Sequence, residues 1–331
     1  MKNMPKRNIA VVCGGYSGEY EVSLRSADNV IENILLAGYN TYKVVIEKDR
    51  WFSPQGTNNL PIDKSDFSVI LPDQSRLKLD YAYITIHGTP GEDGVLQGYF
   101  DMLGVPYNTG GMLCESLTFN KEVCNRYLSS FGIRIAPSCC LRHITEQEIF
   151  REEIEALGLP VFVKPNVGGS SIATTKVILP EQLAPAIKTA FSEGKEVLIE
   201  RFIQGIEVTC GCLVLPNKTI PLPVTEVVAH SDFFDYDAKY NGLSDEITPA
   251  RLPEPLYVEI QQLTAHIAKW IRAQGLIRVD YIIEQDGHPT LLEVNTTPGM
   301  TATSFIPQQV AAAQMSLKDI FAQIIESHSS L

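Results

Sequence analysis

The sequence lacks the cysteine spacing of a zinc or redox motif. Its seven cysteines form no Cys-x-x-Cys pair, because Cys139 and Cys140 are adjacent and Cys210 and Cys212 lie two positions apart. Such cysteines are typical of reduced thiols in a cytoplasm. No apolar run is long enough to span a bilayer, and the run near the N-terminus is too short for a signal peptide. We therefore expect a cytoplasmic protein that does not enter a membrane.

An excess of positive charge is also missing. Lys and Arg number 27 against 39 Asp and Glu, which gives a formal net charge of -12 at pH 7. A surface of this sign argues against nucleic acid or an anionic membrane as a partner. A negatively charged substrate would then need a local basic pocket.

The composition is that of an ordinary globular protein, with 44% hydrophobic and 20% charged residues. The length predicts about two domains, or three small ones that share an interface. Residues 1–115 alternate strand-like and helical patterns, which predicts a small doubly wound α/β domain. Residues 116–208 and 209–331 mix strands and helices without strict alternation, so the predicted fold class is α/β and α+β.

Local patterns predict several elements along the chain. Helices are expected at about 94–103, 113–131 and 257–273, from apolar spacing and the glycines that follow. Thr145 and Glu148 have the spacing of a capping box at a helix start. The polar stretch 230–252 lacks periodicity, which favours a long loop that serves as an active-site lid.

Two strand-like runs near the C-terminus, LIRVDYIIEQ and HPTLLEVN, flank the dipeptide Asp-Gly at 286–287, which is a strong hairpin signal. If these two residues form the turn, Asp280 faces Glu293 and Arg278 faces Asn295. Alternation along a strand then places these four side chains on one face. It assigns the opposite, apolar face to Ile277, Val279, Leu292 and Val294.

The opposed carboxylates of Asp280 and Glu293 require a compensating cation, because like charges destabilise a pair of strands. Two carboxylates and an amide oxygen are hard ligands suited to Mg²⁺, which typically keeps waters and is completed by substrate phosphates. The alternative is a solvated acidic edge in which Arg278 pairs with one carboxylate. The opposition of acid to acid, rather than of acid to base, favours the metal.

A second motif, VFVKPNVGGSSIATTK, places Lys164 on a strand before a Gly/Ser loop whose backbone N–H groups can face an anion. It is not a Walker A motif, and CGGYSGE is not the G-x-G-x-x-G of a nicotinamide-binding Rossmann site. A glycine-rich hairpin turn beside a surface lysine would have the same sequence pattern. The motif therefore indicates a nucleotide only in combination with the acidic cluster.

The strand lysine, the Gly/Ser loop and the late Asp…Glu-x-Asn cluster together resemble the ATP-grasp superfamily. More narrowly, GGYSGEYEVS, HGTPGEDG, KPNVGGSS, YDAKY and LLEVNTTPGMT, in this order over nearly the whole chain, resemble the D-alanine:D-alanine ligase family. The resemblance implies an ATP-grasp fold in three parts. Residues 1–115 would bind substrate, 116–208 would carry the phosphate loop, and 209–331 would carry the lid loop and the metal site.

The resemblance also implies an activity, the ATP-dependent joining of two D-alanines through a D-alanyl phosphate, for peptidoglycan precursor synthesis. The reaction would require ATP and two Mg²⁺ ions, for which Mn²⁺ could substitute. The resemblance also implies a homodimer. A sister ligase that uses D-lactate or D-serine is one alternative, and a nucleotide-binding regulatory module without turnover is another. Lys239-Tyr240 resembles the dipeptide-forming type of lid loop, whereas depsipeptide-forming relatives typically carry a histidine there.

Individual residues take roles from the resemblance. Lys121 and Lys164 would contact the ATP phosphates, Glu200 and the segment Arg201 to Ile203 would hold adenine, and Glu207 would hold the ribose. The full ATP-binding set is Lys121, Lys164, Ser171, Glu200, Arg201, Ile203, Glu207 and Lys239. The metal ligands would be Asp280, Glu293 and Asn295.

The substrate pocket is assigned in the same way. Glu19 would bind the ammonium of the first D-alanine, and Arg278 and the Gly299 backbone would stabilise its reacting carboxyl group. Ser304 and the Phe305 backbone would hold the carboxylate of the second D-alanine. The lid would be latched to Glu19 by Ser170 and Tyr240, and His87 would be a further pocket residue.

Each role has a structural alternative. Glu19 could simply favour a helix N-terminus by its charge, and Lys121 could lie on a solvated helix face. Tyr240 could be a packed loop aromatic, and His87 a structural polar group at a strand end. The sequence also departs from the family pattern in the phosphate loop, where Gly168 replaces a common acid and Ala173 a common glycine.

Overall fold

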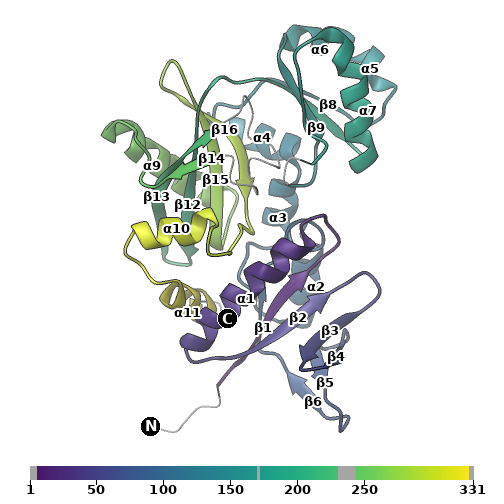
Figure 1. Cartoon of the computed structure of the whole chain (residues 1–331), viewed down its shortest axis with the longest axis vertical. Helices are drawn as coiled ribbons and strands as arrows, with labels where there is room; N and C mark the ends of the chain where they lie inside the picture. The colour runs from purple at the N-terminus through teal and green to yellow at the C-terminus, as the bar shows by residue number, and fades with distance from the viewer. Residues whose placement is uncertain (1–5, 170–171, 230–243, 328–331) are drawn as a thin grey trace.

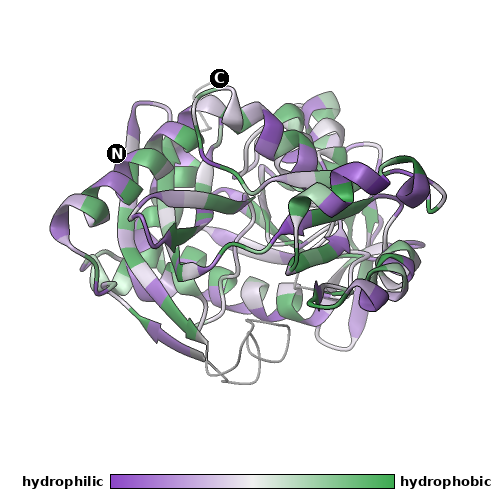
Figure 2. Cartoon of the chain, turned by 90° about the horizontal axis from the view of Figure 1, so that it is seen from above, coloured by the Kyte–Doolittle hydropathy of each residue, from purple (hydrophilic) through white to green (hydrophobic). Residues whose placement is uncertain are grey.

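The computed structural model describes residues 6–169, 172–229 and 244–327. No helix in these ranges is long and apolar enough to cross a membrane. The helices carry hydrophobic and hydrophilic segments side by side, as expected where one face covers a sheet and the other meets solvent (Figure 2).

Three β-sheets organise the chain (Figure 1). A seven-stranded sheet is built from residues 8–84, a four-stranded sheet from 138–201 and a five-stranded sheet from 205–295. The two smaller sheets lie toward one end of the molecule and the seven-stranded sheet lies toward the other (Figure 1). The mixture of parallel and antiparallel sheets confirms the predicted fold class, whereas the predicted domain boundaries stay a prediction.

The N-terminal sheet is parallel only in part. Its strand order is β6-β5-β4-β3-β2-β1-β7, in which β1 pairs in parallel with β2 and β7 and the remaining pairs are antiparallel. The strands are β1 (Asn8–Gly14), β2 (Asn40–Ile46), β3 (Trp51–Gln55), β4 (Asn58–Asp63), β5 (Ser68–Ile70), β6 (Arg76–Lys78) and β7 (Tyr81–Ile84). The predicted α/β pattern therefore holds for β1, β2 and β7, with helix α1 (Tyr20–Leu36) following β1.

The predicted single helix at 113–131 is wrong, because the chain forms two helices there. Helix α2 (Val95–Leu103) is followed by α3 (Met112–Phe119) and α4 (Lys121–Ser129). Asn120 separates α3 from α4 with an extended backbone, and its side chain accepts a hydrogen bond from the N–H of Val123 at 3.0 Å. Lys121 thus becomes the first residue of a helix instead of a mid-helix residue.

The central sheet is antiparallel, with the order β10-β9-β11-β8. Its elements are β8 (Ser138–Leu141), α5 (Glu146–Ile149), α6 (Arg151–Leu157), β9 (Val161–Pro165), β10 (Thr175–Val177), α7 (Leu183–Glu193) and β11 (Val197–Arg201). The predicted capping box does not form, since the Thr145 side chain makes no capping hydrogen bond. Glu146 instead accepts from the N–H of Arg142 at 2.6 Å, which fixes the turn before α5.

The C-terminal sheet is also antiparallel, in the order β14-β13-β12-β15-β16. Its elements are β12 (Gly205–Leu215), β13 (Lys218–Ala229), β14 (Ser244–Ile247), α9 (Glu254–Trp270), β15 (Gly275–Glu284), β16 (Pro289–Asn295), α10 (Phe305–Ala312) and α11 (Leu317–Ser327). Helix α9 corresponds to the predicted helix at 257–273. Apolar residues of α11, including Phe321, pack in one core with Ile34 of α1, so the two ends of the chain are joined by hydrophobic contact.

The β15–β16 hairpin reaches its predicted register by an unpredicted route. The N–H of Gly287 donates to Glu284 O at 2.9 Å and Glu284 faces His288, so three residues form the turn instead of two. That turn shifts the pairing next to it by one residue from the predicted register, so Ile282 faces Thr290 instead of Leu291. A bulge then leaves Leu292 unpaired, and beyond it the predicted pairs are restored.

The restored register decides which side chains face the site. Asp280 pairs with Glu293 and Arg278 with Asn295, as predicted. The prediction that Leu292 lies on the core face is wrong, because the bulge turns this half-buried side chain toward the cleft described below. Leu291 packs in the core with Val279 and Val294 instead.

Candidate active site

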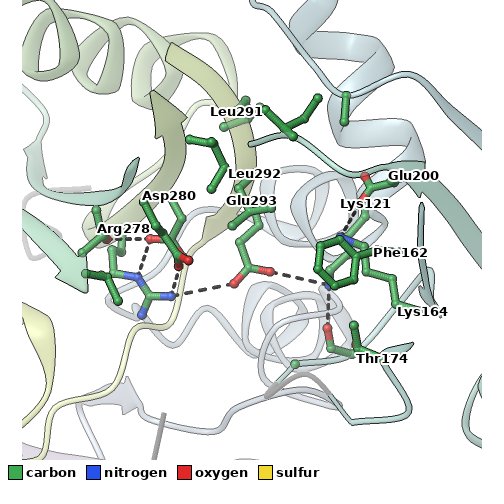
Figure 3. A pocket seen from close by; sticks show the side chains of 18 of the residues that line it. Lys121, Phe162, Lys164, Thr174, Glu200, Arg278, Asp280, Leu291, Leu292 and Glu293 are labelled. Carbon is green, nitrogen blue, oxygen red and sulfur yellow. Dashed lines mark hydrogen bonds and ion pairs between the residues drawn. The ribbon is translucent and has the colours of Figure 1, made fainter. Parts of the chain in front are cut away.

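A cleft of about 700 Å³ collects residues from the central and C-terminal sheets, from helix α4 and from loops that include residues 16–19 after β1. Eleven of the predicted site residues line it: Glu19, Lys121, Lys164, Glu200, Arg201, Ile203, Glu207, Arg278, Asp280, Glu293 and Phe305. Their side chains come from segments far apart in the sequence, and Figure 3 shows the part of the cleft that holds the charged groups.

Eight predicted residues are not in that lining. His87, Asn295, Gly299 and Ser304 are described but lie outside it. Ser170, Ser171, Lys239 and Tyr240 fall outside the described residues, and so does most of the predicted lid loop. The roles assigned to these eight residues stay predictions.

Arg278 and Asp280 form a buried ion pair on β15. The guanidinium donates from Nε to Oδ1 at 2.8 Å and from Nη2 to Oδ2 at 2.7 Å, so the pair is bidentate. The two residues are only 5% and 6% exposed. Thr209 of β12 donates to Asp280 Oδ1 at 2.5 Å, and the guanidinium stacks over the Phe305 ring, 5.3 Å from its centroid. These contacts fix the Arg278 head at the cleft wall.

Glu293 lies between two cations (Figure 3). Its Oε1 is 3.8 Å from Arg278 Nη2, and its Oε2 is 3.9 Å from Lys121 Nζ. The Glu293 side chain is 30% exposed, so its carboxylate is more accessible from the cleft than that of Asp280. The arginine pairing that the sequence analysis kept as an alternative is thus present at Asp280, while the more exposed Glu293 faces the cleft.

Asn295 completes the polar face of the hairpin. It pairs with Arg278 across the strands, and its Oδ1 accepts from the N–H of Thr297 at 3.1 Å. Across the described part of the chain, no group of three or more His, Cys, Asp or Glu is placed to hold a metal. A cation at this face would therefore depend on two carboxylates and one amide oxygen, a donor set that fits Mg²⁺.

The segment after β16 folds back toward the N-terminal region. Thr296 donates to the buried carboxyl group of Glu115 on α3 at 2.5 Å. A side-chain carbon at Gly299 would lie 2.8 Å from Ser304 Oγ, so a larger residue there would displace the Ser304 hydroxyl. Gly299 and Ser304, which the sequence analysis assigned to the two substrates, are thus direct neighbours.

Two lysines add to the positive charge of the cleft. The Lys121 ammonium donates to Gly168 O at 2.6 Å, and Lys164 of β9 forms an ion pair with the buried Glu200 of β11. Burial lowers the pKa of Lys121, and the nearby charge of Glu293 opposes that effect. Since the net charge of the chain is negative, these two lysines form the local basic pocket that an anionic substrate needs.

Glu19 meets the phosphate loop directly. A side-chain carbon at Gly169 would lie 2.6 Å from Glu19 Oε2, so a larger residue there would displace the Glu19 carboxylate. The backbone angles of the two residues that depart from the family pattern, Gly168 and Ala173, are informative. Gly168 has φ +115 and Ala173 has φ +54, so both positions adopt backbone conformations that favour glycine. Glycine at 168 is suited to its position, whereas Ala173 keeps the strain that glycine would relieve.

Sequence reasoning missed Glu92, although it lies within the quoted motif HGTPGEDG. Its Oε2 accepts from the N–H of Gly88 at 2.6 Å. Burial and the nearby charge of Glu19 raise the pKa of Glu92 to about 8. The acid in this motif could have been selected as a candidate, but its raised pKa depends on neighbours that only the fold brings together.

We expect Glu92→Gln to remove a pH-dependent loss of stability. The raised pKa means that the folded chain keeps this proton at pH values where the unfolded chain has lost it. The stabilisation that this proton gives to the folded chain is present below the glutamate pKa of the unfolded chain. It is lost as pH rises through the folded-state pKa of about 8. From pH 6 to pH 8, the wild type should lose about 2 kcal/mol of unfolding free energy relative to Glu92→Gln. Urea denaturation with a chelator measures this, and parallel pH curves for the two proteins would contradict it.

The fold and the cleft define the class of protein. Two lysines, an arginine–carboxylate cluster and Gly168 and Gly169 after β9 line one cleft whose walls come from two antiparallel sheets, which is the arrangement of an ATP-grasp enzyme. Sequence models described as the D-ala D-ala ligase N-terminus and C-terminus match residues 8–110 and 128–326. The chain belongs to the D-alanine–D-alanine ligase family.

Individual relatives agree. A D-alanine–D-alanine ligase of Porphyromonas gingivalis is 59% identical over 323 residues, covering 97% of this chain and 98% of the relative. The D-Ala:D-Ser ligase VanG of Enterococcus faecalis is 32% identical with a TM-score of 0.86, covering 98% of this chain and 100% of that one. A Bacillus anthracis D-alanine–D-alanine ligase complexed with ATP is 28% identical with a TM-score of 0.77, covering 97% of each chain.

Proposed function

We propose that this enzyme joins two D-alanines into D-alanyl-D-alanine with ATP, as a step in the synthesis of peptidoglycan precursors. The observation that carries the proposal is the meeting, in one cleft, of Lys121, Lys164, Arg278 and the Asp280–Glu293 pair. The high identity to curated ligases over nearly the full length supports the same substrates. A cytoplasmic location and a homodimer remain predictions.

The chemistry begins with a carboxylate, which is a poor acyl donor. An oxygen of the first D-alanine carboxylate attacks the γ-phosphorus of ATP, and ADP leaves. The product is D-alanyl phosphate. The amine of the second D-alanine then attacks the acyl carbon and releases inorganic phosphate, while the ammonium proton of the acceptor is lost to the surroundings.

The side chains of the cleft mainly position and neutralise. Lys121 and Lys164 place positive charge where the phosphates of ATP would lie. Arg278, held rigidly by Asp280, directs its guanidinium at the charge that develops on the reacting carboxyl group. Glu19, beside the phosphate loop, would hold the ammonium of the first D-alanine.

The metal requirement rests on the hairpin face. Asp280, Glu293 and Asn295 offer the hard oxygen donors that Mg²⁺ prefers, and Glu293 is the most open of them to the cleft. When bound, Mg²⁺ would supply positive charge beside the phosphates. Binding there would require Asp280 to share oxygens that now accept from Arg278 and Thr209.

Phosphate release with ATP, Mg²⁺ and D-alanine tests the proposal directly. We expect D-alanine-dependent formation of ADP and D-alanyl-D-alanine, and none with L-alanine as the control. If ADP formation does not depend on D-alanine, the ligase function is rejected and a regulatory module becomes the better account.

The second substrate needs its own experiment, because VanG shows that a D-serine ligase shares this architecture. D-alanine, D-serine and D-lactate should compete in one reaction whose products are identified by mass spectrometry. The identity to D-alanine–D-alanine ligases and the Lys239-Tyr240 sequence support D-alanyl-D-alanine as the main product. A predominance of D-alanyl-D-lactate or D-alanyl-D-serine would overturn this choice of acceptor and leave the first step unchanged.

A further inference from the structure

Asn166 is a buried amide that follows the strand carrying Lys164. It lies two residues after that lysine, just beyond β9, and is 0% exposed. Its Nδ2 donates to Glu196 Oε2 at 2.7 Å and to Asn120 Oδ1 at 2.9 Å. Its backbone N–H donates to Glu196 O at 2.9 Å. The side chain is therefore held in one orientation by partners on both sides.

The same residue caps a helix from another part of the chain. Helix α4 begins at Lys121, and the first N–H groups of a helix have no partner within it. The N–H of Lys121 donates to Asn166 O at 3.1 Å, and the N–H of Glu122 donates to Asn166 Oδ1 at 2.9 Å. The next N–H, that of Val123, is taken by Asn120. Asn166 thus satisfies two of the first three donors of α4.

This capping ties the two cleft lysines together. Lys164 lies on β9, two residues before Asn166. The backbone oxygen of Asn166 accepts from the N–H of Lys121 and its side chain accepts from the N–H of Glu122, so this one residue links the backbones that carry the two lysines. The Lys121 ammonium also reaches Gly168 O, in the loop after Asn166. Because the first three N–H groups of α4 are occupied, the charge offered to an anion comes from the lysines and not from the helix end.

We propose that Asn166 is a positioning residue that sets the separation of the Lys121 and Lys164 ammonium groups for the phosphates of ATP. The inference rests on the proposed function of these lysines. Two ammonium groups repel each other, and Lys164 contributes to lowering the pKa of Lys121. A rigid link between α4 and β9 keeps the two ammonium groups at one spacing before ATP binds. The free energy of ATP binding then need not offset the cost of ordering these lysines.

The test compares Asn166→Ala with a control that also loses a side-chain amide accepting backbone hydrogen bonds. Gln182 accepts from the N–H groups of Ile178 and Leu179 at 2.9 and 3.0 Å, in the same part of the chain but outside the cleft lining. Both variants lose a side-chain amide that accepts backbone hydrogen bonds, so both should melt at a lower temperature. Only Asn166→Ala should weaken the binding of a non-hydrolysable ATP analogue with Mg²⁺, by about tenfold or more in calorimetric titration.

Further readouts separate positioning from stability. In Asn166→Ala, the amide of Glu122 loses its acceptor and should exchange faster with solvent, whereas the Lys121 amide keeps the backbone oxygen of residue 166. The KM for ATP should rise while the KM for D-alanine stays within about twofold. Asn166→Ser is the milder substitution to use if the alanine variant does not fold. Asn166→Ser should change analogue affinity, amide exchange and the KM for ATP in the same directions, by smaller amounts.

The outcomes distinguish this inference from the function on which it rests. If Lys121→Ala and Lys164→Ala leave analogue binding unchanged, the proposed role of the lysines fails and the inference fails with it. If those variants weaken binding but Asn166→Ala and Asn166→Ser bind as the wild type does, the positioning role alone is overturned. A loss of affinity in Gln182→Ala equal to that in Asn166→Ala would likewise overturn it, because the effect would then follow from lost stability.

Discussion

Glu293→Gln should lower kcat/KM for ATP by about two orders of magnitude, the loss typical of removing one group that stabilises a transition state. The substitution keeps the shape of the side chain and removes one charge from the proposed metal face. The Asp280 ion pair with Arg278 and the hydrogen bond from Thr209 do not involve the changed side chain. The loss should grow as Mg²⁺ becomes limiting, which initial rates measured over a Mg²⁺ series would reveal.

Stability should respond differently from turnover. Glu293 loses two distant attractions, to Arg278 at 3.8 Å and Lys121 at 3.9 Å, and is also relieved of repulsion by the facing Asp280. These effects oppose each other on a partly exposed side chain, so unfolding free energy should change by less than about 1 kcal/mol. Glu284→Gln is the matched control, since Glu284 lies on the same hairpin and pairs with Arg134 away from the cleft. Wild-type activity of Glu293→Gln at limiting Mg²⁺ would show that the metal assignment is wrong.

Arg278→Met should be the most damaging single substitution for stability and turnover together. It leaves the Asp280 carboxylate buried without its bidentate partner, which typically destabilises a protein by about 3–5 kcal/mol. It also removes the cation proposed to face the reacting carboxyl group, so turnover should fall below detection. Chemical denaturation and an ADP-release assay measure the two effects separately.

The double variant Arg278→Met/Asp280→Asn separates the two roles of the arginine. With the carboxylate neutralised, most of the lost stability should return, because no uncompensated charge remains buried. Turnover should not return, since the guanidinium is still missing. Recovery of activity in the double variant would mean that Arg278 serves only to balance Asp280, and the proposed catalytic role would be withdrawn.

The sequence predicted the chemistry of the hairpin better than its backbone. The facing pairs Asp280–Glu293 and Arg278–Asn295 follow from the alternation of side chains and are confirmed. The turn and the bulge were not predicted, because the extra turn residue shifts the pairing by one and the bulge at Leu292 shifts it back, so the pairs beyond the bulge are those of a regular hairpin. A pattern of alternating residues cannot distinguish two cancelling insertions from none.

Other features depended on distant parts of the chain. The break at Asn120 was missed because apolar spacing continues through it, whereas the cap that ends α3 and starts α4 uses Asn166, far away in sequence. The proton affinity of Glu92 likewise depends on the burial and the charges that the fold collects around it. Motifs therefore located most of the cleft, while the groups that orient and tune its side chains became visible only in three dimensions.

The two irregularities of the β15–β16 hairpin also mark where this chain can change length over evolution. Deleting one residue of the three-residue turn would leave Glu284 facing His288, because the residues of the turn take no part in the pairing of the strands. Deleting Leu292 would leave Asp280 facing Glu293, because the bulge residue has no partner across the strands. Either deletion alone would therefore shorten the hairpin without moving the proposed metal ligands. Homologous chains should differ in length at these two places more readily than within the paired stretch that carries the polar residues.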